Sequence, residues 1–140
     1  GVMRKCTPDR QRAEFLMAES QNSFEGMQER VDKLGISEKS ANSIVKDCYD
    51  ILMELIRAKL LLAGYKSAGL FAHEGEIAFL AELNFSENEI SFLNDIRYFR
   101  NSVTYYGKIL TAEYAAKVVE FTDETYPKLK EKNGLKNKHP

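Results

Sequence analysis

The chain has 140 residues, of which 44% are hydrophobic and 29% are charged. This length and composition predict one globular domain over residues 1–140, with enough core to fold without disulfides or metals. The net charge is −1 and the mean hydropathy is −0.41, so we expect neither a general attraction to nucleic acid nor a membrane span.

The cysteines and the N-terminal segment point to a reducing compartment. Cys6 and Cys48 are not in CxxC spacing, and the segment GVMRKCTPDRQRAEF becomes charged at once, unlike a secretory signal. We therefore expect a cytoplasmic protein, with Cys48 buried as a small hydrophobic residue.

The first predicted helix covers residues 8–34, with Thr7 as its N-cap and Gly35 as its stop. One stripe of positions recurs every three or four residues and predicts its buried face. The stripe consists of Ala13, Leu16, Ser20, Phe24, Met27, Val31 and Leu34.

The second predicted helix covers residues 38–63, between Ser37 as cap and Gly64 as stop. It has two neighbouring apolar seams, which predict a central helix or one shared between the core and a subunit interface. The seams are Ile44, Cys48, Ile51, Leu55, Ala58 and Leu62, and Val45, Tyr49, Leu52 and Ile56; the remaining stripe is Asp47, Asp50, Glu54 and Arg57.

Three helical segments follow. Residues 70–83 predict a short helix. A second helix over 86–105 is predicted to begin at the capping box of Ser86 and Glu89 and to end before Gly107. Thr111 is the predicted cap of a last helix, which Pro127 should kink. The basic tail, residues 131–140, is expected to be loose, with an ordered core over about 8–130. These elements predict an all-α fold: an antiparallel up-down four-helix bundle with an additional short helix.

The helix over 86–105 carries the residues best suited to binding. Its predicted core seam is Phe92, Ile96, Phe99, Val103 and Tyr106, while Arg97, Arg100, Asn101 and Thr104 group on another arc. Guanidinium groups suit phosphate, and a carboxamide both donates and accepts hydrogen bonds. The alternative is structural: Arg97 or Arg100 pairs with Asp50 or Glu54, and Asn101 is solvated.

The order of these features resembles the HEPN superfamily (higher eukaryotes and prokaryotes nucleotide-binding domain). The matching stretches are ILMELIRAKLLLAGYKSAGLFAHEGEIAFLAEL, residues 51–83, and ISFLNDIRYFRNSVTYYG, residues 90–107. The resemblance implies a homodimeric bundle that binds a nucleotide or RNA phosphate, often as the partner of a small nucleotidyltransferase in a toxin–antitoxin-like pair. The implied binding residues are Arg97, Arg100, Asn101 and Tyr105, with Asp50 and Glu54 as supporting acids.

The RNA-cleaving members of that family carry an Arg followed four to six residues later by a His, and this chain departs from that pattern. Residues 105–107 read Tyr-Tyr-Gly, and a phenol with an ordinary pKa of about 10 is a poor base at neutral pH. The sequence thus favours binding over catalysis, although Arg100, Tyr105 and His73 are the candidates for a divergent metal-independent ribonuclease. A third reading is a non-catalytic dimerisation adaptor.

Neither a metal nor a cofactor is expected. The chain has two histidines, one of them in the tail, and it contains no P-loop, GxGxxG, GxSxG or HExxH motif.

Overall fold

A computed structural model describes residues 2–68, 72–107 and 109–131 of the chain. In these ranges the protein is an all-α helical bundle with one small sheet, as the sequence predicts for its fold class. In chain order the elements are β1 (Val2–Lys5), α1 (Arg10–Leu34), α2 (Ala41–Leu62), β2 (Tyr65–Ala68), α3 (Ala72–Ala78), the 3-10 helix η1 (Phe79–Leu83), α4 (Glu87–Tyr106) and α5 (Ala112–Glu131).

Helix α2 is the centre of the fold, as predicted. It contacts α1, α3, α4 and α5, and its second apolar seam is as deeply buried as the first. The exposed fractions of Val45, Tyr49, Leu52 and Ile56 are 0%, 1%, 0% and 0%. Both seams are therefore covered within one chain, apart from Leu62 in the last turn of α2, which is 37% exposed.

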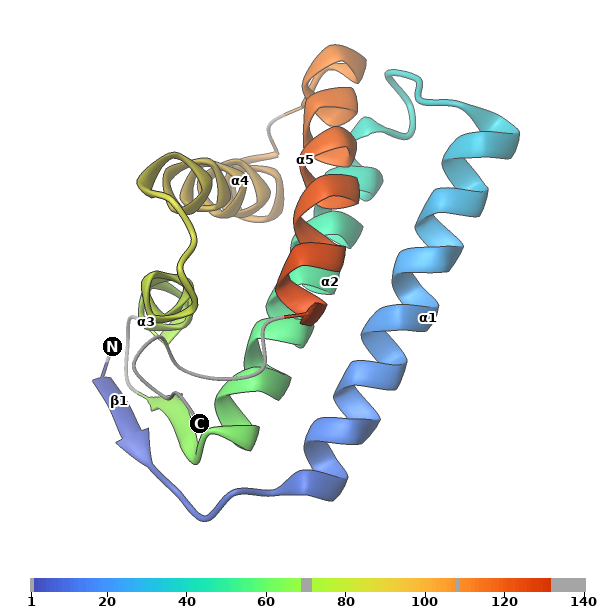
Figure 1. Cartoon of the computed structure of the whole chain (residues 1–140). Coiled ribbons are helices and arrows are strands. Elements are labelled where there is room, and N and C mark those ends of the chain that lie inside the picture. The colour runs from blue at the N-terminus through green and yellow to red at the C-terminus, as the bar shows by residue number, and fades with distance from the viewer. Residues whose placement is uncertain (1, 69–71, 108, 132–140) are drawn as a thin grey trace.

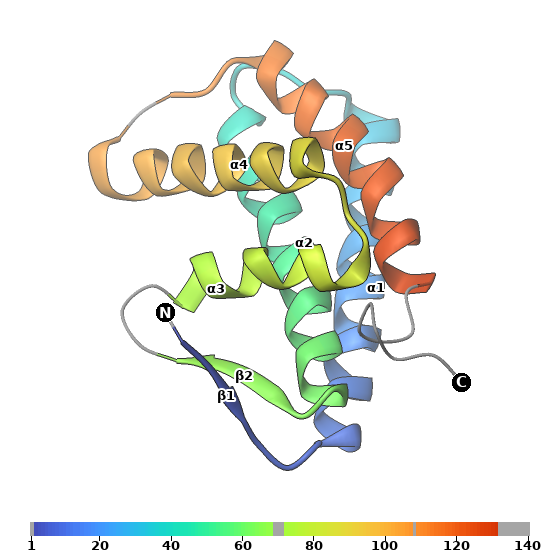
Figure 2. The same cartoon turned by 60° about the vertical axis from the view of Figure 1, so that its left-hand side comes forward.

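The helices form two sets with different directions. Figures 1 and 2 show α1, α2 and α5 side by side, with α3 and α4 lying across α2. Helices α2 and α5 run in the same direction: the backbone N–H of Leu110 donates to Asn42 at 2.7 Å at one end, and Lys59 donates to the carbonyl of Lys130 at 2.9 Å at the other. Because α4 crosses α2, the inner face of α4 packs against the middle of the central helix.

Buried polar groups join α1 to α5. The hydroxyls of Ser20 and Tyr126 are 2.7 Å apart, and the Tyr126 ring stacks on Phe24 with centroids 4.3 Å apart. These contacts explain why Ser20 belongs to the predicted apolar stripe despite its hydroxyl, since its hydrogen-bonding capacity is met inside the protein.

Helix ends agree with the sequence in part. The capping box of Ser86 and Glu89 and the cap at Thr111 are confirmed. The predicted caps at Thr7 and Ser37 are wrong, because α1 begins after Asp9, whose carboxylate accepts from Arg12 N–H, and α2 begins after Ser40. Ser37 and Ser40 form a turn that precedes α2. The polar groups of Ser37, which predicted a helix start at this residue, take part in that turn instead.

Three residues of the predicted seams lie outside the core. Leu34, Leu62 and Tyr106 are the last residues of α1, α2 and α4 and are 80%, 37% and 84% exposed. On α4, Leu93 and Ile96 are fully buried. Phe92, Phe99 and Val103 are half-buried and pack against the core.

The sheet was not predicted. β1 pairs antiparallel with β2, more than fifty residues away, with Arg4 opposite Lys66 and Lys5 opposite Tyr65. Gly64 turns the chain from α2 into β2 with φ +81°, and its carbonyl accepts from the Cys6 N–H at 2.8 Å. An added Cβ at Gly64 would lie 3.1 Å from the Cys6 carbonyl oxygen, so this junction requires glycine.

Two further expectations concern the ends of helices and of the chain. Helix α5 continues past Pro127 to Glu131, and the predicted loose tail from 132 onward lies outside the described residues.

Within the described ranges, none of the helices combines the length and the apolar character needed to cross a bilayer.

Candidate nucleotide-binding face

Helix α4 carries the predicted binding residues, and local bonds fix both of its ends. Ser86 Oγ accepts from the Glu89 N–H, and the Glu89 carboxylate accepts from the Ser86 N–H at 2.8 Å. Lys128 Nζ on α5 contacts the same carboxylate at 2.8 Å and 2.9 Å, and Gly107 ends the helix with φ +66°. The side chains of the last three turns therefore project from a helix whose position and register are defined.

Arg100 is held between α4 and α2. Its Nη2 lies 3.6 Å from Asp50 Oδ1, and its Cζ lies 5.6 Å from the centroid of the Tyr49 ring. Its side chain is 25% exposed, and its Nε is buried without a hydrogen-bond partner among the described residues. The contact with Asp50 is one of the pairings that the structural alternative predicted for Arg100, and the guanidinium still reaches solvent.

Three arginines act electrostatically on the buried Tyr49. Burial raises the pKa of Tyr49 to about 12, although the positive charges of Arg57, Arg97 and Arg100 act in the opposite direction. Two of these arginines belong to α4 and the third to α2. Of these, Arg100 lies over the phenol ring, and Arg97 and Arg100 are both half-buried.

Arg57 forms an ion pair that sequence reasoning missed. Its Nε donates to Glu76 at 2.8 Å and its Nη2 donates to the same carboxylate at 3.1 Å, and Glu76 is only 6% exposed. Burial opposes the charge of Arg57, but the Glu76 hydrogen bonds outweigh it and the pKa of Arg57 is raised. The signal in the sequence was Glu76 itself, an acid three residues after His73 in the predicted short helix.

Three further polar or aromatic side chains project from α4. Asn101 is half-buried, while Tyr98 and Tyr105 are 62% and 71% exposed. Arg97, Asn101 and Tyr105 follow one another at intervals of four residues and so share one stripe of the helix. Tyr98 was not predicted, although its spacing of seven from Tyr105 places both on one face.

Two predicted residues are not brought to Arg100. Glu54 lines the cleft between α1 and α2, and its pKa is raised by burial and by the charge of Glu19. None of the ion pairs among the described residues joins Glu54 to an arginine. His73 lies in α3, and its side chain is outside the described part of the structure.

The cleft between α1 and α2 has a volume of about 380 Å³ and lies beyond Asp50 from the α4 face. Arg30 spans it, with Nη1 3.4 Å from Asp47 and Nη2 2.7 Å from the Ser43 hydroxyl. Burial raises the pKa of Asp47 against the opposing charge of Arg30. Among the described residues, no group of three histidines, cysteines or acids is arranged to hold a metal ion.

Comparison with known proteins gave no assignment: no protein-family model, no curated protein and no solved structure matches the chain. The geometry of α4 and its neighbours is therefore the basis for any functional conclusion.

Proposed function

We propose that the face of α4 formed by Arg97, Arg100, Asn101 and Tyr105 binds a phosphate group of a nucleotide or of RNA. The observation that carries the proposal is the placement of Arg100. A partly exposed guanidinium held against Tyr49 and Asp50 is available to an anion without first losing much side-chain freedom. Planar guanidinium donors match the oxygens of a phosphate group.

Exposed Tyr105 supports a nucleotide ligand over a simple anion. Its ring is 71% exposed and belongs to the stripe of α4 that also contains Arg97 and Asn101. Unpaired bases stack on exposed aromatic rings, while cations beside the rings contact the backbone. This combination favours a mononucleotide or single-stranded RNA as the ligand.

Binding is proposed in preference to cleavage. The partners that the structure gives Arg100 are a carboxylate and a buried ring, and Tyr105 replaces the histidine of the family's ribonuclease motif. Incubation of the purified protein with single-stranded RNA, without metal, separates the two activities. We expect binding with intact RNA; protein-dependent cleavage that is lost in Arg100→Ala would replace the binding proposal with a ribonuclease.

We also propose, from the family resemblance, that two copies associate through the C-terminal end of α4. Tyr106 is 84% exposed and Ile109 is 75% exposed, and a second copy would cover them. Sedimentation equilibrium at tens of micromolar tests this proposal. A dimer that becomes a monomer in a Tyr106→Ser, Ile109→Ser variant supports it, and a monomeric wild-type protein contradicts it.

A nucleotidyltransferase partner is the remaining expectation from the resemblance. Co-purification of such an enzyme with the protein would support it, and it would also distinguish a two-component pair from a dimerisation adaptor that acts alone.

A further inference from the structure

A second cleft opens where the two-stranded sheet meets α1, α2 and α3. Its volume is about 300 Å³, at the lower end of the range for small-molecule sites. It is lined by Arg12, Leu16, Glu54, Arg57, Leu60, Leu61, Tyr65, Lys66 and Glu76. These residues come from distant parts of the chain, so no local sequence motif predicts the cleft.

One part of the lining is apolar. Leu60 is 1% exposed, and Leu16 and Leu61 are half-buried. An apolar ligand group placed against Leu16 and Leu61 would remove hydrocarbon surface from water, which is favourable in proportion to the area covered.

Two exposed cations stand at the rim of this lining. Arg12 and Lys66 are exposed, and none of the ion pairs formed among the described residues includes either of them. Neighbouring Arg10, by contrast, pairs with Glu14 at 3.2 Å. The rim therefore has positive charge available to an anionic ligand.

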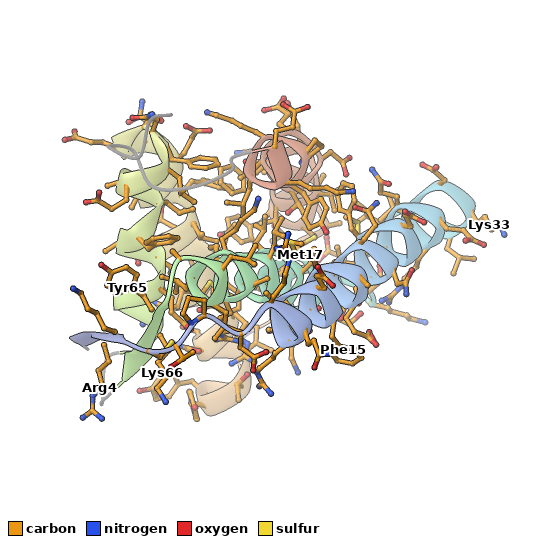
Figure 3. All side chains as sticks on the ribbon, turned by 60° about the horizontal axis from the view of Figure 1, so that its bottom comes forward. Arg4, Phe15, Met17, Lys33, Tyr65 and Lys66 are labelled. Carbon is orange, nitrogen blue, oxygen red and sulfur yellow. The ribbon has the colours of Figure 1, made fainter. Side chains whose placement is uncertain are left out.

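The sheet adds a second, independent sign of an unmet charge. Arg4 is paired directly opposite Lys66, and Figure 3 shows both side chains extending from the same side of the two strands. Like charges at directly opposite positions destabilise a strand pair. An anion bound beside Lys66 would relieve this repulsion.

The acids of the cleft limit the charge of the ligand. Glu76 is neutralised by its bidentate pair with Arg57, whereas Glu54 carries its charge into the cleft. The three cations and two carboxylates of the lining leave one positive charge in excess. Glu54 repels a polyanion such as RNA more strongly than a singly charged group, which Arg12 and Lys66 can balance.

We propose that the cleft beneath the two-stranded sheet binds a small organic monoanion, a carboxylate on a flat or branched apolar body. The carboxylate is received by Arg12 and Lys66, and the apolar body lies against Leu16, Leu60 and Leu61. This site is separate from the α4 face and does not depend on the function proposed there.

Calorimetric titration with 2-naphthoate and with its uncharged analogue 2-naphthamide tests the proposal. Naphthoate should bind to the full-length protein at least about ten-fold more tightly than naphthamide, as expected for a charge-assisted contact. The double variant Arg12→Gln, Lys66→Gln should lose about ten-fold in naphthoate affinity. The matched control Arg10→Gln, two residues earlier on the same helix, should bind like wild type.

Four outcomes overturn the proposal: no naphthoate binding, equal binding of naphthoate and naphthamide, an unaffected double variant, or inorganic phosphate binding as tightly as naphthoate. The last would mean that the apolar wall contributes nothing. The Arg100→Ala variant separates this site from the α4 face, since it should bind naphthoate normally. Because Arg12 and Lys66 are exposed, melting of the double variant should be cooperative, which confirms that lost binding is not lost folding.

Discussion

The guanidinium of Arg100 lies over the buried ring of Tyr49, with its Cζ 5.6 Å from the ring centroid. A cation over an aromatic face is attracted by the electrons of the ring, and the attraction is stronger where water is excluded. Tyr49 comes from the central helix and Arg100 from the helix that crosses it, so the contact positions a binding residue through the core. The ring also leaves the outer edge of the guanidinium accessible.

Asp50→Asn tests how the acid beside Arg100 affects a phosphate ligand. Asp50 is 60% exposed, so its ion pair contributes little to stability, while its negative charge repels an incoming phosphate. We expect RNA affinity to rise about two- to five-fold with an unchanged melting temperature. Fluorescence anisotropy with a labelled single-stranded RNA measures it, and Asp32→Asn on exposed α1 is the control. Weaker binding by Asp50→Asn would show that the acid is needed to hold Arg100.

Leu55→Asp should unfold the domain. Leu55 is fully buried in α2, and an uncompensated carboxylate there costs more than about 4 kcal/mol. Leu62 belongs to the same predicted seam but is 37% exposed, so Leu62→Asp should cost about 1 kcal/mol or less. Chemical denaturation followed by circular dichroism separates the two variants. Similar losses in both would contradict the burial that distinguishes these two leucines.

Glu89 gives the fold a defined sensitivity to acid. Burial opposes its charge, but hydrogen bonds from Lys128 and Ser86 outweigh burial and lower the pKa of Glu89 below its usual value of 4.5. A carboxyl group with a lowered pKa stabilises the folded state above its unfolded pKa, and this contribution is lost as the pH falls through the folded pKa. Glu89→Gln should therefore cost about 1 kcal/mol at pH 7, and the difference from wild type should shrink as the pH falls below 4.5.

Thermal unfolding of both proteins across that pH range measures the effect. Glu87→Gln, in the same first turn but exposed, should lose much less at pH 7 because the helix dipole is its main interaction. A Glu89→Gln difference that stays constant with pH would contradict the ion pair with Lys128.

The two cysteines should differ in reactivity. Cys48 is fully buried and burial raises the pKa of its thiol to about 12, whereas Cys6 is half-exposed beside the sheet. Thiolate is the reactive form, so iodoacetamide at pH 8 should alkylate Cys6 first and Cys48 only after unfolding. Peptide mass spectrometry identifies the modified residue. Early modification of Cys48 in the folded protein would mean that α2 and α5 open readily around it.

The helices and the core were predictable because their signals are local and periodic. The burial of Cys48 and both seams of α2 follows from apolar spacing, and the start of α4 follows from the capping box at Ser86. The crossing of α4 over α2 was not predictable, since an apolar stripe shows which face is buried but not the angle at which it packs.

The sheet and the ion pairs depend on contacts distant in sequence. β1 and β2 are four residues each and lack an alternating apolar pattern, so only the folded chain reveals their pairing. The contact of Arg100 with Asp50 was foreseen as one of several pairings, while the choice of Asp50 over Glu54 required the position of α4. Glu76 was missed because its partner Arg57 is nineteen residues earlier, on another helix.

The central claim is that Arg100 binds phosphate on the α4 face, and the affinity for single-stranded RNA at low salt tests it most directly. Wild type, Arg100→Ala, Arg100→Lys and the control Arg10→Ala should be compared by fluorescence anisotropy, with melting curves to verify folding. We predict an affinity loss of about ten-fold or more for Arg100→Ala, a smaller loss for Arg100→Lys, and none for Arg10→Ala. Equal RNA affinity of wild type and a folded Arg100→Ala would contradict the claim.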